Sequence, residues 1–147
     1  LLLALGGHDT SERVGRHEVR GVPFQASTSV VADYYRAADV YVHAAKADTF
    51  PNVVIEAMAC GCPVIGTRVG GIPEQIEAGR TGFLVPMGDV AELAARISDV
   101  LGDTGLRHRM GQAAAALAAE HYDLRTQVDA YLRWYEDIIE TKRRSSS

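Results

Sequence analysis

Short apolar runs alternate with amphipathic stretches along most of the chain. Apolar runs bounded by turn residues predict buried strands, and apolar residues that recur every three or four positions predict helices. Strands are expected at residues 1–5, 17–22, 39–43, 63–67 and 81–85. Helices are expected over 27–38, from 51 or 52 to about 60, and over 73–76, with longer amphipathic helices after the last strand. The polar segment 8–16 predicts a loop.

This order of elements predicts an α/β fold. Strands alternating with helices imply right-handed crossovers and a doubly wound parallel sheet. Asp89 and Glu92 form a capping-box pattern at the start of the first helix after the last strand. The extra C-terminal helices have no strands between them, so they must pack on the sheet or against a neighbour.

Composition narrows the class of protein. The 147 residues are enough for one domain, and the net charge of −4 argues against a broad nucleic-acid footprint. No apolar run approaches the roughly 20 residues that cross a bilayer, and no stretch has the pattern of a signal peptide. Cys60 and Cys62 are too close for a zinc or redox pair, which fits a cytoplasmic setting. The predicted domain covers 1–141, followed by a disordered basic and serine-rich tail at 142–147.

The first candidate functional residues lie just after the predicted strand 39–43. Asp48 lies in the loop and Glu56 about one turn inside the next helix, whose apolar sequence predicts that it is buried. A buried carboxylate needs a partner, either a lysine or arginine or a pair of ligand hydroxyls. The free N–H groups at the helix start suit a diphosphate. From these residues alone, an ion-paired helix glutamate and an ordinary loop aspartate explain the pattern at least as well.

A second feature follows the next strand, at Gly70 and Gly71. Two glycines allow the backbone to approach a ligand closely, while Pro73 and Glu74 suit the first turn of a helix. A plain strand-to-helix turn has the same pattern. However, ligands of open α/β sheets bind at the carboxyl ends of the strands, so two such features at successive strand ends should face one crevice.

The stretch from Asp48 to Glu74, DTFPNVVIEAMACGCPVIGTRVGGIPE, resembles retaining GT-B glycosyltransferases of family four. The segments 34–40, 81–86 and 109–111 are similar too, so that the likeness covers essentially the whole chain. The family is known for a Glu-x7-Glu pattern, which is Asp48-x7-Glu56 here.

The resemblance implies roles for individual residues. Glu56 would bind the ribose hydroxyls of a nucleotide-diphospho-sugar donor, and Asp48 would lie near the donor sugar and its diphosphate as the catalytic acidic position. The other implied donor-site residues are Phe50, Pro51, Asn52, Gly70, Gly71, Glu74, Val22 and Pro23. Such enzymes typically need no bound metal, and no other cofactor is expected.

Two departures from the family pattern stand out. Asp48 is one methylene shorter than the usual glutamate, and Ala44-Ala45 replaces a Pro-Ser pair. His43 falls at a position that is an ordinary strand end in the family, so it is not expected to be catalytic. The family's first strand and helix, with a basic pair that grips the diphosphate, precede the position of Leu1. The sheet is therefore expected to be incomplete at its amino end, with the central position next to the strand 39–43 unfilled, and the isolated chain to be marginally stable.

The predicted function is the donor half of a retaining glycosyltransferase of hexosyltransferase type. Its partners would be the nucleotide-sugar donor and an acceptor domain of the same parent chain, with no nucleic acid. The parent is expected in the cytoplasm, where it could bind peripherally to the inner face of the membrane. The fragment alone is expected to be inactive. Two alternatives remain: a non-enzymatic nucleotide-sugar-binding module and a sugar-nucleotide epimerase on the same fold.

Overall fold

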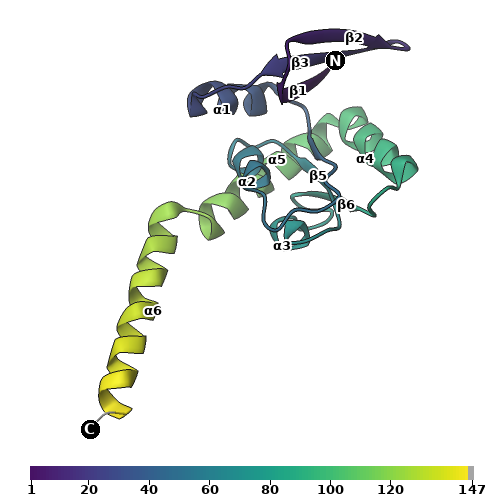
Figure 1. The fold of residues 1–147 in the computed structure, drawn as a ribbon. Helices are drawn as coiled ribbons and strands as arrows, with labels where there is room; N and C mark the ends of the chain where they lie inside the picture. The colour runs from purple at the N-terminus through teal and green to yellow at the C-terminus, as the bar shows by residue number, and fades with distance from the viewer. Residues whose placement is uncertain (146–147) are drawn as a thin grey trace.

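The computed structural model describes residues 1–145, which form two separate sheets and a set of helices (Figure 1). The first sheet has the order β1-β3-β2 and consists of β1 (Leu2–Gly7), β2 (Thr10–Val14) and β3 (His17–Pro23). The second has the order β4-β5-β6 and consists of β4 (Tyr41–His43), β5 (Val64–Thr67) and β6 (Gly82–Val85), all parallel. The helices are α1 (Thr28–Ala37), α2 (Asn52–Ala59), α3 (Ile72–Gln75), α4 (Val90–Gly102), α5 (Thr104–His121) and α6 (Leu124–Ser145).

The core lies around the second sheet, with apolar clusters on both faces. Successive side chains of a strand point to opposite faces, and on β5 Val64 packs into one cluster with Met58 while Ile65 packs into another with Met110. All four residues of β5 are buried, as expected for a central parallel strand covered on both sides. This part of the chain confirms the expected doubly wound α/β arrangement.

The prediction of a loop over 8–16 is wrong, because Thr10–Val14 forms β2. This strand pairs antiparallel with β3, with Val14 opposite His17. Gly15 adopts a φ of +62° between them, which suits a tight hairpin turn. All five residues of β2 are exposed, and an edge strand with no buried face shows no apolar alternation in its sequence. The polar sequence of β2 therefore predicts a loop and not a strand.

The burial expected for the strand at 1–5 is also wrong. β1 pairs in parallel with β3, but all six of its residues are exposed, including Leu2 at 53% and Leu5 at 39%. β1 and β4 belong to different sheets. No strand within residues 1–145 therefore fills the central position between them. The apolar side chains of β1 remain exposed.

Most predicted boundaries agree with the structure to within one or two residues. The Asp89 side chain caps α4 by accepting a hydrogen bond from the Glu92 backbone N–H at 2.9 Å. This is one of the two hydrogen bonds of the predicted capping box. At the C-terminus, α6 continues through Ser145. The boundary predicted at 141 and 142 thus falls inside a helix, and residues 146–147 of the expected tail lie outside the described residues.

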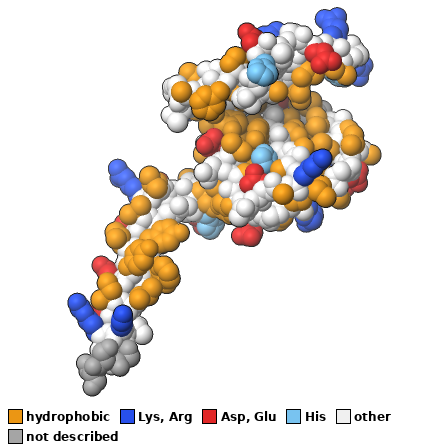
Figure 2. Space-filling view, in the orientation of Figure 1, with side chains coloured by type: hydrophobic (Ala, Val, Ile, Leu, Met, Phe, Trp, Pro, Cys, Tyr) orange, Lys and Arg blue, Asp and Glu red, His pale blue; other side chains and the backbone are white. Residues whose placement is uncertain are grey.

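Helix α6 extends away from the second sheet and the helices packed around it (Figure 1). We call α6 the arm, and that sheet with its helices the body. Its apolar residues are largely exposed, from 45% for Ile138 to 72% for Leu124. Figure 2 shows hydrophobic side chains along this arm. Within residues 1–145, no helix combines the length and the hydropathy that crossing a bilayer requires.

Candidate functional site

A cavity of about 590 Å³ lies between the end of the first sheet, α1 and α2. Its size falls within the range of small-molecule sites. Figure 2 shows the hollow between the first sheet and the body below, with hydrophobic side chains on its floor. The cavity is lined by Leu5, Gly6, Phe24, Gln25, Ala26, Thr28, Val31, Ala32, Tyr35, Val53, Glu56, Ala59 and Cys60.

The helical repeat of α2 divides its residues between core and cavity. Val54, Ala57 and Met58 are buried on one side. Val53, Glu56 and Cys60, spaced by three and four positions, line the cavity on the other. Gly61 ends the helix with a φ of +75°, and its N–H donates to the Met58 carbonyl at 2.9 Å, as the sequence predicts.

The expectation that Glu56 is buried is wrong, because its side chain is exposed in the cavity wall. The apolar residues around it cover the opposite side of α2, whereas its own side faces open space. Within residues 1–145, no hydrogen bond or ion pair engages the Glu56 carboxylate. Both of its oxygens are therefore free to accept hydrogen bonds from a ligand that enters the cavity.

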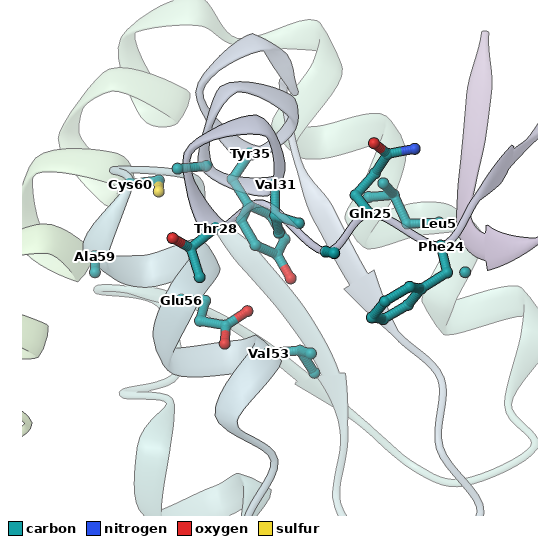
Figure 3. Close-up of a pocket in the computed structure, with 13 residues that line it drawn as sticks. Leu5, Phe24, Gln25, Thr28, Val31, Tyr35, Val53, Glu56, Ala59 and Cys60 are labelled. Carbon is teal, nitrogen blue, oxygen red and sulfur yellow. The ribbon is translucent and has the colours of Figure 1, made fainter.

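Tyr35 adds a hydroxyl group to the cavity wall next to this carboxylate. Figure 3 shows Tyr35 and Glu56 reaching into the same space. The Tyr35 ring contacts Tyr41 edge to face, with 5.4 Å between ring centroids. Burial, followed by the negative charge of Glu56, raises the pKa of Tyr41 to about 12. Burial, followed by the charges of Tyr41 and Glu56, raises the pKa of Tyr35 as well. At neutral pH both hydroxyls keep their protons and can donate hydrogen bonds.

Asp48 lies in the loop after β4 and is held by a histidine. His43 Nε2 lies 3.2 Å from Asp48 Oδ2, and the Tyr41 hydroxyl lies 3.2 Å from His43 Nδ1. The Asp48 side chain is 33% exposed, so one part of the carboxylate remains accessible. From the sequence, His43 is expected to be an ordinary strand end, and Tyr41 is not among the expected site residues. The signal for both was their spacing of two on one strand, which places them on the same face.

The Gly70-Gly71 turn packs directly on the loop that carries Asp48. Gly70 has a φ of +50°, and a Cβ at this residue would overlap the Asp48 carbonyl oxygen. The Gly71 N–H donates to the Thr49 carbonyl at 2.9 Å. The loops after β4 and β5 thus meet, but the close approach that the glycines allow is between two backbone segments and not with a ligand. The common crevice expected from the sequence stays a prediction, because Asp48, Gly70 and Gly71 do not line the cavity beside Glu56.

The start of α2 has no side-chain cap. Gln75, which is completely buried on α3, donates through Nε2 to the Pro51 carbonyl at 3.1 Å. This contact fixes the residue that precedes the first turn of α2. The N–H groups of that turn remain uncapped by side chains, as an anion site at a helix N-terminus requires.

The other predicted site residues do not all surround Glu56. The side chains of Phe50 and Asn52 face a second hollow of about 580 Å³. It is lined by Phe50, Asn52, Ile55, Gln127, Ala130, Tyr131 and Trp134. Neither hollow is lined by the remaining predicted site residues, which are Asp48, Pro51, Gly70, Gly71, Val22, Pro23 and Glu74.

Phe24 and Gln25, which the sequence analysis missed, form the cavity wall just past β3 (Figure 3). Their place directly after the carboxyl end of a strand was the available signal. Within residues 1–145, no group of three or more His, Cys, Asp and Glu side chains is arranged to hold a metal ion.

Comparison with known proteins shows the family to which the chain belongs. Residues 11–117 match the family described as glycosyl transferases group 1. N-acetyl-alpha-D-glucosaminyl L-malate synthase of Bacillus anthracis is 36% identical over 118 residues, which are 80% of this chain and 31% of that protein.

Two solved structures show the same arrangement of elements. Sucrose-phosphate synthase from Thermosynechococcus elongatus superimposes with a TM-score of 0.78 at 30% identity, covering 84% of this chain and 31% of that one. HepE from Anabaena in complex with UDP-glucose gives a TM-score of 0.70 at 31% identity, covering 80% of this chain and 33% of that one. The chain thus spans about a third of the length of each of these proteins.

Proposed function

The chain belongs to the glycosyl transferases group 1 family, and from that membership we propose that its cavity binds the nucleotide-sugar donor of a GT-B glycosyltransferase. The parent protein transfers a hexose-type sugar from the donor to a hydroxyl acceptor with retention at the anomeric carbon. A further domain of the parent supplies the acceptor. The proposal includes no bound metal, as the sequence resemblance implies.

The Glu56 carboxylate is the observation that carries this proposal. It faces a cavity of ligand size, and no hydrogen bond or ion pair within residues 1–145 occupies it. A carboxylate with two free oxygens matches the adjacent hydroxyls of a ribose. The solved relative that contains UDP-glucose supports the same class of ligand. The apolar floor and the Tyr35 hydroxyl suit the rest of a nucleoside.

The remaining roles follow from the direction in which α2 points. Its uncapped first turn provides partial positive charge for the diphosphate. Asp48, in the loop just before that turn, lies toward the donor sugar. As the bond between the anomeric carbon and the diphosphate oxygen breaks, positive charge develops on the sugar and negative charge on the leaving group. The protein contributes positioning and electrostatic stabilisation of these charges.

The test begins with binding and proceeds to turnover. The chain is titrated with UDP, GDP and ADP and with their glucose derivatives, followed by NMR. The longest natural protein that contains the chain is then assayed for release of nucleoside diphosphate, and the anomeric configuration of the product is determined. Donor binding without release in any acceptor mixture would favour a binding module. Exchange of the hydrogen at the second carbon of the sugar would identify an epimerase.

A further inference from the structure

Three side chains form a hydrogen-bonded chain that runs along β4 and ends on Asp48. The Tyr41 hydroxyl lies 3.2 Å from His43 Nδ1, and His43 Nε2 lies 3.2 Å from Asp48 Oδ2. The two rings lie on the same face of the strand, with centroids 6.1 Å apart and planes inclined by 30°. The His43 side chain is 16% exposed. The imidazole is therefore enclosed between a hydroxyl and a carboxylate.

The proton positions in this chain follow from the donors and acceptors available. An ionised carboxylate only accepts hydrogen bonds, so Nε2 must carry the proton that reaches Asp48. Nδ1 of the neutral ring then accepts, and the Tyr41 hydroxyl donates to it. The pKa of Tyr41, raised to about 12 by burial and by the charges of Glu56 and Asp48, keeps that hydroxyl protonated at neutral pH. One neutral tautomer of His43 therefore satisfies every group.

The neighbouring elements hold the chain in place. On α1, Tyr35 packs edge to face on Tyr41. On β5, the Thr67 hydroxyl donates to the Ala45 carbonyl at 2.6 Å and lies 3.5 Å from the His43 carbonyl, which braces the backbone at the end of β4. Cys62 is a further titratable group near Tyr41. Within residues 1–145, His43 is the only ion-pairing partner of Asp48.

We propose that His43 is a positioning residue for Asp48. Its Nε2–H fixes Oδ2 and leaves Oδ1 directed to the donor sugar. This role rests on the proposed function of the cavity. Asp48 has a shorter side chain than glutamate, and the imidazole from the strand supplies the fixed orientation that a longer, unsupported side chain would lack. Tyr41 sets the tautomer that makes Nε2 the donor.

The binding test separates positioning from a structural role. The nucleoside diphosphate and its matching glucose derivative, chosen from the uridine, guanosine and adenosine pairs, are titrated against the chain and its variants. His43→Leu should weaken binding of the nucleotide sugar about tenfold, as expected for loss of a hydrogen bond to a charged group. It should change binding of the nucleoside diphosphate by less than about twofold. His43→Gln should recover most of the loss because its amide can donate to Oδ2, and His108→Leu, exposed on α5, is the matched control.

The outcomes distinguish this proposal from the proposed function. If the unmodified chain binds none of the ligands, the proposed function fails, and this role fails with it. If it binds the nucleotide sugar and His43→Leu binds it equally well, only the positioning role is overturned. Equal weakening of both ligands without recovery in His43→Gln assigns His43 a structural role and overturns the proposal as well.

Nitrogen-15 NMR of the histidine ring provides a readout that needs no ligand. The expected spectrum shows a ring proton on Nε2 of His43 and the chemical shift of a hydrogen-bond acceptor at Nδ1. Tyr41→Phe should move the Nδ1 resonance, and Asp48→Ala should move that of Nε2. A neutral ring with its proton on Nδ1 would overturn the proposal, whatever the ligands do.

Discussion

The Asp48 carbonyl oxygen occupies the space that a side chain at Gly70 would need. Gly70 adopts a φ of +50°, in the left-handed region that favours glycine. Because Gly70 follows β5 and Asp48 follows β4, this contact joins two loops at the carboxyl ends of neighbouring strands. The position of the catalytic candidate thus depends on a residue without a side chain on the next loop.

Gly70→Ala should displace the loop that carries Asp48. A Cβ there meets backbone, which cannot move aside as a flexible side chain can. We expect a loss of about 2–4 kcal/mol in the free energy of unfolding by urea, more than the roughly 1 kcal/mol cost of a positive φ alone. Nucleotide-sugar binding should weaken at least about tenfold.

Gly79→Ala is the matched control for that variant. Gly79 also has a positive φ, of +83°, but no atom lies within 4 Å of the position of its added Cβ. It should show only the cost of the backbone conformation and leave ligand binding unchanged. Equal losses in the two variants would mean that the contact with Asp48 contributes nothing.

Glu56→Gln should separate ligand binding from stability. The carboxylate is exposed and has no hydrogen-bonding partner within residues 1–145, so the free energy of unfolding should change by no more than about 0.5 kcal/mol. Nucleoside diphosphate binding should weaken about tenfold, since an amide accepts at only one of its two polar atoms. Glu120→Gln, on the exposed end of α5, serves as the control for charge. A stability loss in Glu56→Gln with unchanged binding would make Glu56 a structural residue.

The stability of the chain should fall in alkaline solution. Burial raises the pKa of Cys62 from 9.0 to about 12, and that of Tyr41 from 10.0 to about 12. Above pH 9 the unfolded chain releases these protons while the folded chain retains them, so the unfolded state binds fewer protons and stability decreases with pH. The stabilising contribution is complete below pH 9 and is lost progressively as the pH approaches 12.

Urea unfolding at a series of pH values measures this slope. Tyr41→Phe and Cys62→Ala should each reduce the decrease in stability between pH 9 and 12, whatever their effect at neutral pH. Tyr131→Phe, on the exposed arm, should leave the slope unchanged. The same slope in all variants would show that neither buried group is responsible.

Helix α6 should contribute little to the stability of the body. Its apolar residues are 45–72% exposed, and it adds no residue to either core cluster. A chain ending at Asp123 should therefore unfold within about 3 °C of the full chain, since surface changes are small in free energy. It should also associate less with itself, because the exposed apolar arm is gone. A drop of 10 °C would show that α6 packs on the body in solution.

The two sheets should differ in hydrogen exchange. β5 is buried throughout, whereas β1 and β2 are exposed throughout. Amides of β5 should therefore be protected up to the global unfolding free energy, and those of β1–β3 should exchange through local opening. The marginal stability expected from the sequence remains a prediction, and uniform protection of both sheets would contradict it.

The sequence determined the elements whose signals are local. Gly61 ends α2 as its position predicts, and Asp89 caps α4 through a hydrogen bond that spans three residues. The convergence of the Asp48 and Gly70 loops followed from the rule that parallel strands end on the same edge. The family resemblance also singles out Glu56, and this residue lines the cavity.

Tertiary structure decided burial and contacts between side chains. Glu56 lies in an apolar stretch, yet it is exposed because its side of α2 faces a cavity and not the core. β1 has the composition of a buried strand, but no element within residues 1–145 covers it. The pairing of His43 with Asp48 depends on how the loop turns back at the end of β4. Burial and pairing depend on which surfaces meet in space, and the order of residues along one segment does not specify that.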